Sequence, residues 1–347
     1  MPAPEETPAA RDARGAKGKD AHFLVDLPDR VDLYEVGLRD GLQSETAAID
    51  TQGKVELAIA LMDAGLSRIE ATSFVSPKRI PQLADGEELL ARLPRRSNVQ
   101  LSAVVPNAKG LERACRTEIG EVAVLLSASE TFSQRNTNVS IAGMLSTLEV
   151  LIPAAREKGL SVRGYLSAAW GCPYEGAVDP DRAVRLAERL IELGCYEVSL
   201  GDTIGVATPA SVRMLVERAL DRIATKRIAL HLHDTRGLAL TNLAVGLDMG
   251  IRTFDASIGG LGGCPYAPGA SGNVATEDLV YMLHGLGVET GTNLTRLCEA
   301  ARLAERLLRR DLPGRVHRSG PNERCWFTGP AGARAVPAPG GAAGRER

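Results

Sequence analysis

The chain has 347 residues, of which 44% are hydrophobic, and its formal net charge is −2. Acidic and basic residues are interspersed, so no basic face for nucleic acid or membrane lipid is indicated. A chain of this length and composition can bury a large core as a single domain. Small molecules are therefore the expected partners.

The cysteines and the two ends of the chain favour a cytoplasmic protein. Six cysteines are scattered without a Cys-x-x-Cys pair, which predicts reduced thiols. No apolar run reaches the ~18 residues of a membrane span, and residues 1–28 lack the apolar core of a signal peptide. We interpret residues 1–28 as a disordered arm and the Pro- and Gly-rich residues 328–347 as a disordered tail.

From residue 31 the sequence alternates short β-branched runs with longer segments of helical period, the pattern of repeated βα units. Strands are expected at 31–36, 67–72, 99–105, 121–126, 161–167, 195–200, 227–233 and 252–257. Helices are expected near 50–64, 82–92, 108–117, 140–158, 180–193, 209–224, 237–249, 276–286 and 292–309. Eight such strands predict an α/β fold, a closed (β/α)8 TIM barrel over residues 29–287, followed by a C-terminal helical extension over 288–327.

His231 and His233 are the most informative residues, because alternate residues of a strand project to the same face and can share one metal ion. A buried, hydrogen-bonded histidine pair without metal is the alternative reading. A second strand end, Arg39-Asp40-Gly41, favours the metal, although it could be a salt-bridged turn. Catalytic groups of such barrels gather at the C-terminal ends of the strands.

Polar residues recur at these predicted strand ends. They are Arg39, Asp40 and Gln43 after the first strand, Glu70 and Thr72 at the second, Asp202 after the sixth, and Asn273 beyond the eighth. Asp40, His231, His233 and Asn273 form a nitrogen and oxygen donor set, which favours six-coordinate Mg²⁺ or Mn²⁺ over tetrahedral zinc. Asn273 could instead be a loop residue in a left-handed conformation.

Cys264 lies in a glycine-rich loop over residues 259–273. A thiol in a mobile loop near a cation can act as an acid or a base, whereas most free cysteines are merely small buried residues. Glu70 could serve only to hold Arg39. The sequence carries no dinucleotide fingerprint, Walker loop or serine-hydrolase elbow, so the chemistry is assigned to metal, arginine and thiol.

Four motifs carry a resemblance to a known family. They are Glu35-Val36-Gly37-Leu38-Arg39-Asp40-Gly41-Leu42-Gln43, Glu70-Ala71-Thr72-Ser73-Phe74, Gly171-Cys172-Pro173-Tyr174 and Gly262-Gly263-Cys264-Pro265-Tyr266. Together they resemble the hydroxymethylglutaryl-CoA lyases. These belong with the metal-dependent lyase and Claisen-condensing barrels, and the resemblance spans residues 31 to about 310. It implies a divalent cation at Asp40, His231, His233 and Asn273, and catalytic roles for Arg39, Asp40, Glu70 and Cys264. It also implies a homodimer that binds an acyl-CoA.

The expected reaction is the metal-assisted cleavage of 3-hydroxy-3-methylglutaryl-CoA, or a close 3-hydroxyacyl-CoA, to acetyl-CoA and acetoacetate. Arg39, Gln43, Thr72 and Asp202 are the expected substrate contacts. One alternative is a Claisen-condensing acyltransferase of the isopropylmalate or homocitrate synthase type. Another is a non-catalytic barrel that binds acyl-CoA, because function resides in the site and not in the fold.

Overall fold

Eight parallel strands close into a barrel in the computed structural model, which describes Leu24 and residues 27–263 and 272–322. The barrel strands are β1 (Asp32–Glu35), β2 (Arg68–Ser73), β3 (Gln100–Val104), β4 (Glu121–Ser127), β5 (Ser161–Ser167), β8 (Glu197–Asp202), β9 (Ile228–Leu232) and β10 (Thr253–Ala256). Neighbours follow the order β1-β10-β9-β8-β5-β4-β3-β2, and β1 also pairs with β2 to close the ring. The predicted (β/α)8 barrel is confirmed.

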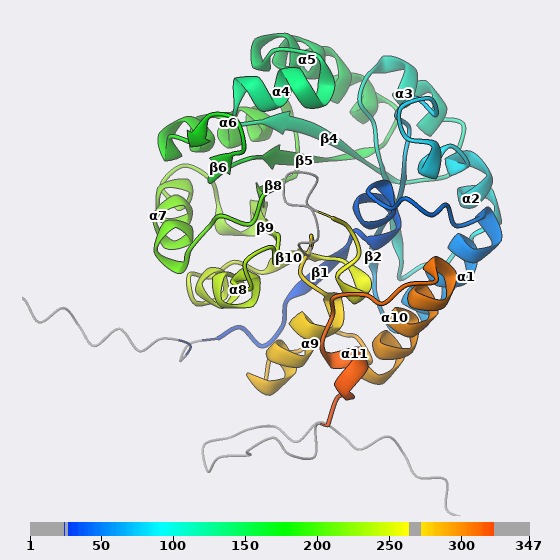
Figure 1. Ribbon diagram of the computed structural model, residues 1–347. Coiled ribbons are helices and arrows are strands. Elements are labelled where there is room, and N and C mark those ends of the chain that lie inside the picture. Colours follow the sequence, from blue (N-terminus) through cyan, green and yellow to red (C-terminus); the bar gives the residue numbers. More distant parts are fainter. Residues whose placement is uncertain (1–23, 25–26, 264–271, 323–347) are drawn as a thin grey trace, which may run out of the picture.

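Helices form a ring around the strands (Figure 1). They are α1 (Thr51–Asp63), α2 (Gly86–Arg92), α3 (Ala108–Ala114), α4 (Glu130–Thr137), α5 (Ile141–Glu157), α6 (Pro180–Leu193), α7 (Pro209–Leu220), α8 (Ala239–Asp248) and α9 (Thr276–Gly285). After them α10 (Leu294–Leu308) packs on α1 and α9, and the short α11 (Val316–Ser319) packs on α10. The described part of the chain therefore ends on the outside of the barrel.

Capping residues define the ends of several helices. The Asp50 carboxylate accepts a 2.8 Å hydrogen bond from Gly53 N and caps α1. Asp179 caps α6 in the same way, with Pro180 in the first turn. Gly194 ends α6 at φ 115°, a conformation that glycine adopts without steric cost.

The barrel interior holds charged side chains. The fully buried Arg163 guanidinium donates to Glu197 Oε1 at 2.8 Å and to both oxygens of Asp255 at 2.6 and 3.1 Å. Burial would lower the pKa of Arg163, but the two carboxylates outweigh it and raise that pKa well above its usual value. The interior charges are therefore paired, while the apolar core lies mainly between strands and helices.

Several elements were not predicted from the sequence. Among them are α4, α11, a π-helical turn over Gly37–Gly41 and an antiparallel hairpin of β6 (Gly171–Cys172) and β7 (Gly176–Ala177). The hairpin follows β5, where only a loop was expected. Apart from residues 24, 27 and 28, the predicted arm lies outside the described residues, as does the whole predicted tail over 328–347.

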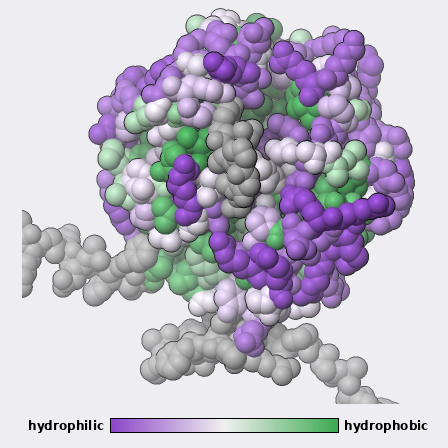
Figure 2. Space-filling model, in the orientation of Figure 1, coloured by the Kyte–Doolittle hydropathy of each residue, from purple (hydrophilic) through white to green (hydrophobic). Residues whose placement is uncertain are grey.

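Hydrophilic side chains predominate around the rim of the face shown in Figure 2, and hydrophobic ones lie nearer its centre.

Within the described part of the chain, no single helix is long and apolar enough to cross a membrane. Together α4 and α5, bent by 64° where they meet, satisfy that test by length and composition.

Candidate metal centre and active site

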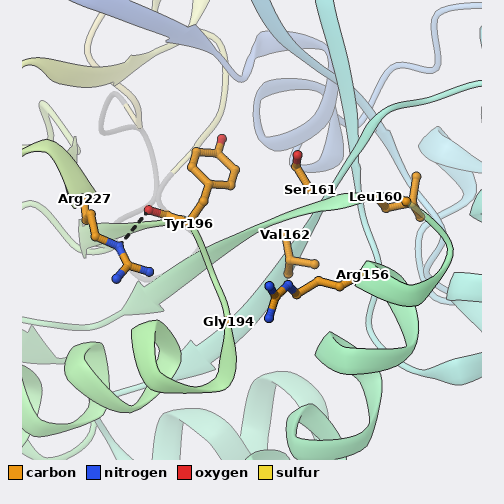
Figure 3. Close-up of a pocket in the computed structure, with 8 residues that line it drawn as sticks. Arg156, Leu160, Ser161, Val162, Gly194, Tyr196 and Arg227 are labelled. Carbon is orange, nitrogen blue, oxygen red and sulfur yellow. Dashed lines mark hydrogen bonds between the residues drawn. The ribbon is translucent and has the colours of Figure 1, made fainter.

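Two cavities lie at opposite ends of the barrel. One, of about 400 Å³, lies at the N-terminal ends of β5, β8 and β9, and its lining includes Arg156, Tyr196 and Arg227 (Figure 3). None of the described residues that line it is a histidine or a carboxylate. The other, of about 140 Å³, lies at the C-terminal ends of the strands, and its lining includes Arg39, Asp40, Gln43, Tyr165, His231 and His233. The side chains suited to metal chemistry thus share the second cavity.

Asp40, His231 and His233 each place one potential ligand atom within 4.8 Å of the other two. The Nε2 atoms of the two histidines face each other at 3.2 Å, and His231 Nε2 lies 3.9 Å from Asp40 Oδ2. His231 belongs to β9, and His233 follows at its C-terminal end. The two rings share a face because one residue separates them in extended chain.

Asp40 reaches the histidines from a π-helical turn, Gly37–Gly41, that directly follows β1. A side chain at Gly37 would place its Cβ 2.6 Å from Glu35 Oε1, so the turn requires glycine there. Asn273 forms an antiparallel bridge with His233, and its Nδ2 donates to Asp40 Oδ2 at 2.9 Å. The four predicted ligands therefore gather at one place, with the amide nitrogen of Asn273 toward Asp40.

The electrostatics favour an ionised carboxylate beside a neutral imidazole. Burial alone would raise the pKa of Asp40, but Arg39 and the two histidines outweigh it and hold that pKa below its usual range. Burial and the neighbouring His231 lower the pKa of His233 to about 4. Both groups are thus in the state that binds a cation at neutral pH.

Arg39 lies between two carboxylates. Its Nε donates to Glu70, and its Nη1 donates to Asp40 Oδ1 at 2.5 Å. The guanidinium carbon also lies 5.2 Å from the centre of the Tyr165 ring. Glu70 is fully buried, and burial raises its pKa in spite of Arg39. These contacts fix the orientation of the guanidinium while its remaining N–H groups line the cavity.

Two predicted substrate contacts lie elsewhere. The Thr72 side chain packs against Gly86 of α2, outside the barrel, because a register shift between Glu70 and Thr72 breaks the alternation of β2. Asp202 accepts hydrogen bonds from Val206 N at 2.9 Å and Ala207 N at 2.8 Å, so its carboxylate holds the loop before α7. Neither residue lines the cavity. That both residues contact substrate stays a prediction, and their side chains point away from this cavity.

Gln43 lines the cavity as expected, and Cys264 lies outside the described residues. The sequence interpretation missed Tyr165, whose buried hydroxyl has no hydrogen-bond partner in the described chain. It also missed Asp255, whose Oδ2 lies 3.3 Å from His231 Nδ1. Both residues carry a detectable signal, because each is a polar side chain inside a predicted strand.

A (β/α)8 barrel with two histidines and a carboxylate at the C-terminal ends of its strands defines the class of metal-dependent barrel enzymes. Residues 30–304 match the HMGL-like family. The chain belongs to this family.

Comparison with known proteins gives close relatives. A zebrafish (Danio rerio) protein named 3-hydroxy-3-methylglutaryl-CoA lyase, cytoplasmic, is 48% identical over 84% of this chain and 88% of its own length. The crystal structure of a Bacillus subtilis HMG-CoA lyase is 46% identical, with a TM-score of 0.84 over 85% of this chain and 99% of that one. An Acinetobacter baumannii HMG-CoA lyase in complex with coenzyme A and 3-methylmalate is 39% identical, with a TM-score of 0.81 over 85% and 96%. Relatives of similar identity are named cytoplasmic or mitochondrial.

Proposed function

We propose that this protein is a divalent-metal-dependent carbon–carbon lyase that cleaves 3-hydroxy-3-methylglutaryl-CoA, or a close 3-hydroxyacyl-CoA, to acetyl-CoA and acetoacetate. The observation that carries the proposal is the gathering of Asp40, His231 and His233 donor atoms within 4.8 Å, in the cavity that Arg39 also lines. The names of close relatives and the coenzyme A bound to one of them support the substrate class.

Mg²⁺ or Mn²⁺ suits this set of donors, because all of them are nitrogen or oxygen and no described thiol lies among them. Asp40, His231 and His233 would hold the cation, with the Asn273 amide oxygen as a fourth ligand once the amide turns. When bound, the cation supplies Lewis acidity that polarises the hydroxyl and carboxylate oxygens of the substrate.

The chain's own groups divide the remaining work. Asp40 is held ionised and accepts the proton of the tertiary hydroxyl. The C–C bond then breaks, the hydroxyl oxygen becomes the ketone oxygen of acetoacetate, and the electron pair of the bond passes to the thioester as an enolate. Arg39 stabilises the enolate oxygen through its free N–H groups, and Glu70 keeps the guanidinium in place. Cys264 delivers a proton to the enolate carbon, which completes acetyl-CoA. The proton taken up by Asp40 then returns to the Cys264 thiolate by exchange with solvent.

Gln43 and Arg39 are the predicted substrate contacts that line this cavity, and we assign Gln43 to the polar end of the acyl group. Acyl-CoA is the expected partner. The homodimer and the cytoplasmic location stay predictions from the sequence.

Turnover of defined substrates tests the proposal. Purified protein with Mg²⁺ is incubated with a panel of 3-hydroxyacyl-CoAs, and separately with acetyl-CoA plus 2-oxo acids, while acetoacetate, acetyl-CoA and free CoA are quantified. Acetoacetate and acetyl-CoA in equal amounts support the lyase, and Asp40→Asn should abolish both. Free CoA from the 2-oxo acid mixtures would favour a condensing acyltransferase. Binding without turnover in either assay would favour a non-catalytic barrel.

A further inference from the structure

Asp255 of β10 lies beside His231 of β9 in the sheet. The two residues are direct partners in the parallel register of these strands, and both side chains are buried in the barrel. The Asp255 Oδ2 atom lies 3.3 Å from His231 Nδ1. Within the described residues this nitrogen makes no hydrogen bond of normal geometry, so the Asp255 carboxylate is the group placed to accept its proton. Asp255 thus meets the ring atom that points away from the cavity, while Nε2 faces His233.

The Asp255 carboxylate is itself held rigidly from three directions. Its Oδ1 accepts from Arg163 Nη2 at 2.6 Å, and its Oδ2 accepts from Arg163 Nη1 at 3.1 Å and from Ser199 Oγ at 2.9 Å. Because these hydrogen bonds fix its orientation, the Asp255 carboxylate presents its remaining acceptor position to the imidazole of His231. Oδ2, the atom that faces His231, therefore cannot rotate away without breaking its hydrogen bonds from Arg163 and Ser199.

We infer that Asp255 is a positioning residue for the proposed metal site: it accepts the Nδ1 proton of His231 and so keeps the Nε2 lone pair directed at the cation. An imidazole ligand must be unprotonated at the nitrogen that binds metal, and the partner at the other nitrogen selects that tautomer. His233 has no such partner at Nδ1 in the described chain. The support is thus specific to His231, and the inference rests on the proposed metal-dependent function.

Asp255→Asn reverses this arrangement with almost no change of shape. Arg163 donates to Oδ1 at 2.6 Å and to Oδ2 at the longer distance of 3.1 Å, so the amide oxygen of asparagine would keep the shorter hydrogen bond at the Oδ1 position. The NH2 group at the Oδ2 position would lose the longer one and can donate to Ser199 Oγ. The amide NH2 would then face His231 and donate to Nδ1. That hydrogen bond forces the proton of the neutral ring onto Nε2, where it blocks the metal.

Glu197→Gln provides a matched control. Glu197 is a second buried carboxylate on the same guanidinium, with Oε1 2.8 Å from Arg163 Nε, and it does not touch His231. Both substitutions remove one charge from the Arg163 cluster. If the cluster is purely structural, both substitutions should change Mn²⁺ affinity to a similar extent. If Asp255 positions His231, only Asp255→Asn should weaken Mn²⁺ binding.

The first measurement is Mn²⁺ affinity, read from the electron paramagnetic resonance of free Mn²⁺. We expect Asp255→Asn to weaken binding about 10–100-fold, the usual cost of losing such a partner, and Glu197→Gln to retain nearly the wild-type affinity. Equal affinities of Asp255→Asn and wild type, or equal losses in both variants, would overturn the inference.

The second measurement reads the tautomer directly in the metal-free wild-type protein, so it decides the matter even if Asp255→Asn does not fold. The chain has only five histidines, and ¹⁵N labelling with His231→Ala identifies the signal of interest. A proton on Nδ1 of neutral His231 supports the inference, and a proton on Nε2 overturns it. Failure of the wild type to bind Mn²⁺ would instead overturn the proposed function, and this inference with it.

Discussion

Arg39 Nη1 donates a 2.5 Å hydrogen bond to Oδ1 of Asp40, the next residue in the chain. The π-helical turn that carries both residues allows two adjacent side chains to point into one cavity, which an extended strand would not do. Because of this contact the group proposed to stabilise the enolate also holds the proposed metal ligand ionised. We therefore propose two distinct functions for Arg39, which substitution can separate.

Replacing Arg39 by lysine retains the positive charge and removes the planar set of donors. Arg39→Lys should lower kcat about 10²–10³-fold, because an ammonium cannot bind Glu70, Asp40 and an enolate oxygen together. Mn²⁺ affinity should change little, since a cation still faces Asp40. Arg113→Lys is the control, because Arg113 also binds a carboxylate through two nitrogens, at Glu87. A kcat near the wild-type value would show that Arg39 serves only as the structural partner of Glu70.

Chelation should abolish turnover, and Mg²⁺ or Mn²⁺ should restore it.

His233→Ala should weaken Mn²⁺ binding strongly and leave the thermal unfolding of the metal-free protein nearly unchanged, because the stability of a barrel resides in the packed layers below the site. His284→Ala, which replaces a histidine in α9, serves as the control. Full activity after exhaustive removal of metal would contradict the proposed centre.

The eight strands and the gathering of the proposed ligands follow from the sequence because they depend on local periodicity. A strand pattern fixes which residues alternate, and the barrel then brings all strand ends to one face. Local periodicity does not place the Thr72 side chain, since a register shift in β2 turns it outward. Nor does it show that backbone N–H groups four and five residues later donate to the Asp202 carboxylate.

The charges inside the barrel could not be assigned from the sequence for a different reason. Arg163 and Asp255 are 92 residues apart, and their contact depends on the order in which β5, β8, β9 and β10 meet in the closed barrel. A single sequence reveals that both residues are charged side chains inside predicted strands, but it does not reveal which charge faces which. The surroundings of His231 depend on the register between strands that are distant in the sequence, and local sequence patterns do not determine that register.

Substrate should protect Cys264 from alkylation if this thiol meets the enolate carbon. Cys172, Cys195 and Cys298 are buried, whereas Cys115 is exposed and provides an internal reference that substrate should not protect. Cys264→Ser should fold normally and lose most of its turnover, because a hydroxyl is far less acidic than a thiol. Mass spectrometry of labelled peptides gives the protection of each cysteine. Unaltered labelling of Cys264 with substrate present would leave Asp40 as the proton carrier.

Glu35 should make the stability of the metal-free protein depend on pH. Its buried carboxyl accepts hydrogen bonds from Gly37 N at 2.8 Å, Ile258 N at 2.9 Å and Thr276 Oγ1 at 2.6 Å, and it joins the turn that carries Arg39 to the segment after β10. Burial raises the pKa of Glu35 to about 7 in spite of these donors.

A folded pKa of about 7, above the usual value of 4.5, means that the folded state binds the proton more tightly. The contribution of Glu35 to the free energy of unfolding is therefore complete below pH 4.5 and is lost as the pH rises through 7, by about 3 kcal/mol in all. Glu35→Gln preserves the shape and can still accept from both N–H groups while its amide donates to Thr276, so it should remove this loss. Denaturant unfolding of both proteins at a series of pH values gives the difference, with Glu157→Gln on the exposed end of α5 as the control. Parallel pH profiles for wild type and Glu35→Gln would show that the carboxyl is ionised at no cost and that its three donors fully replace water.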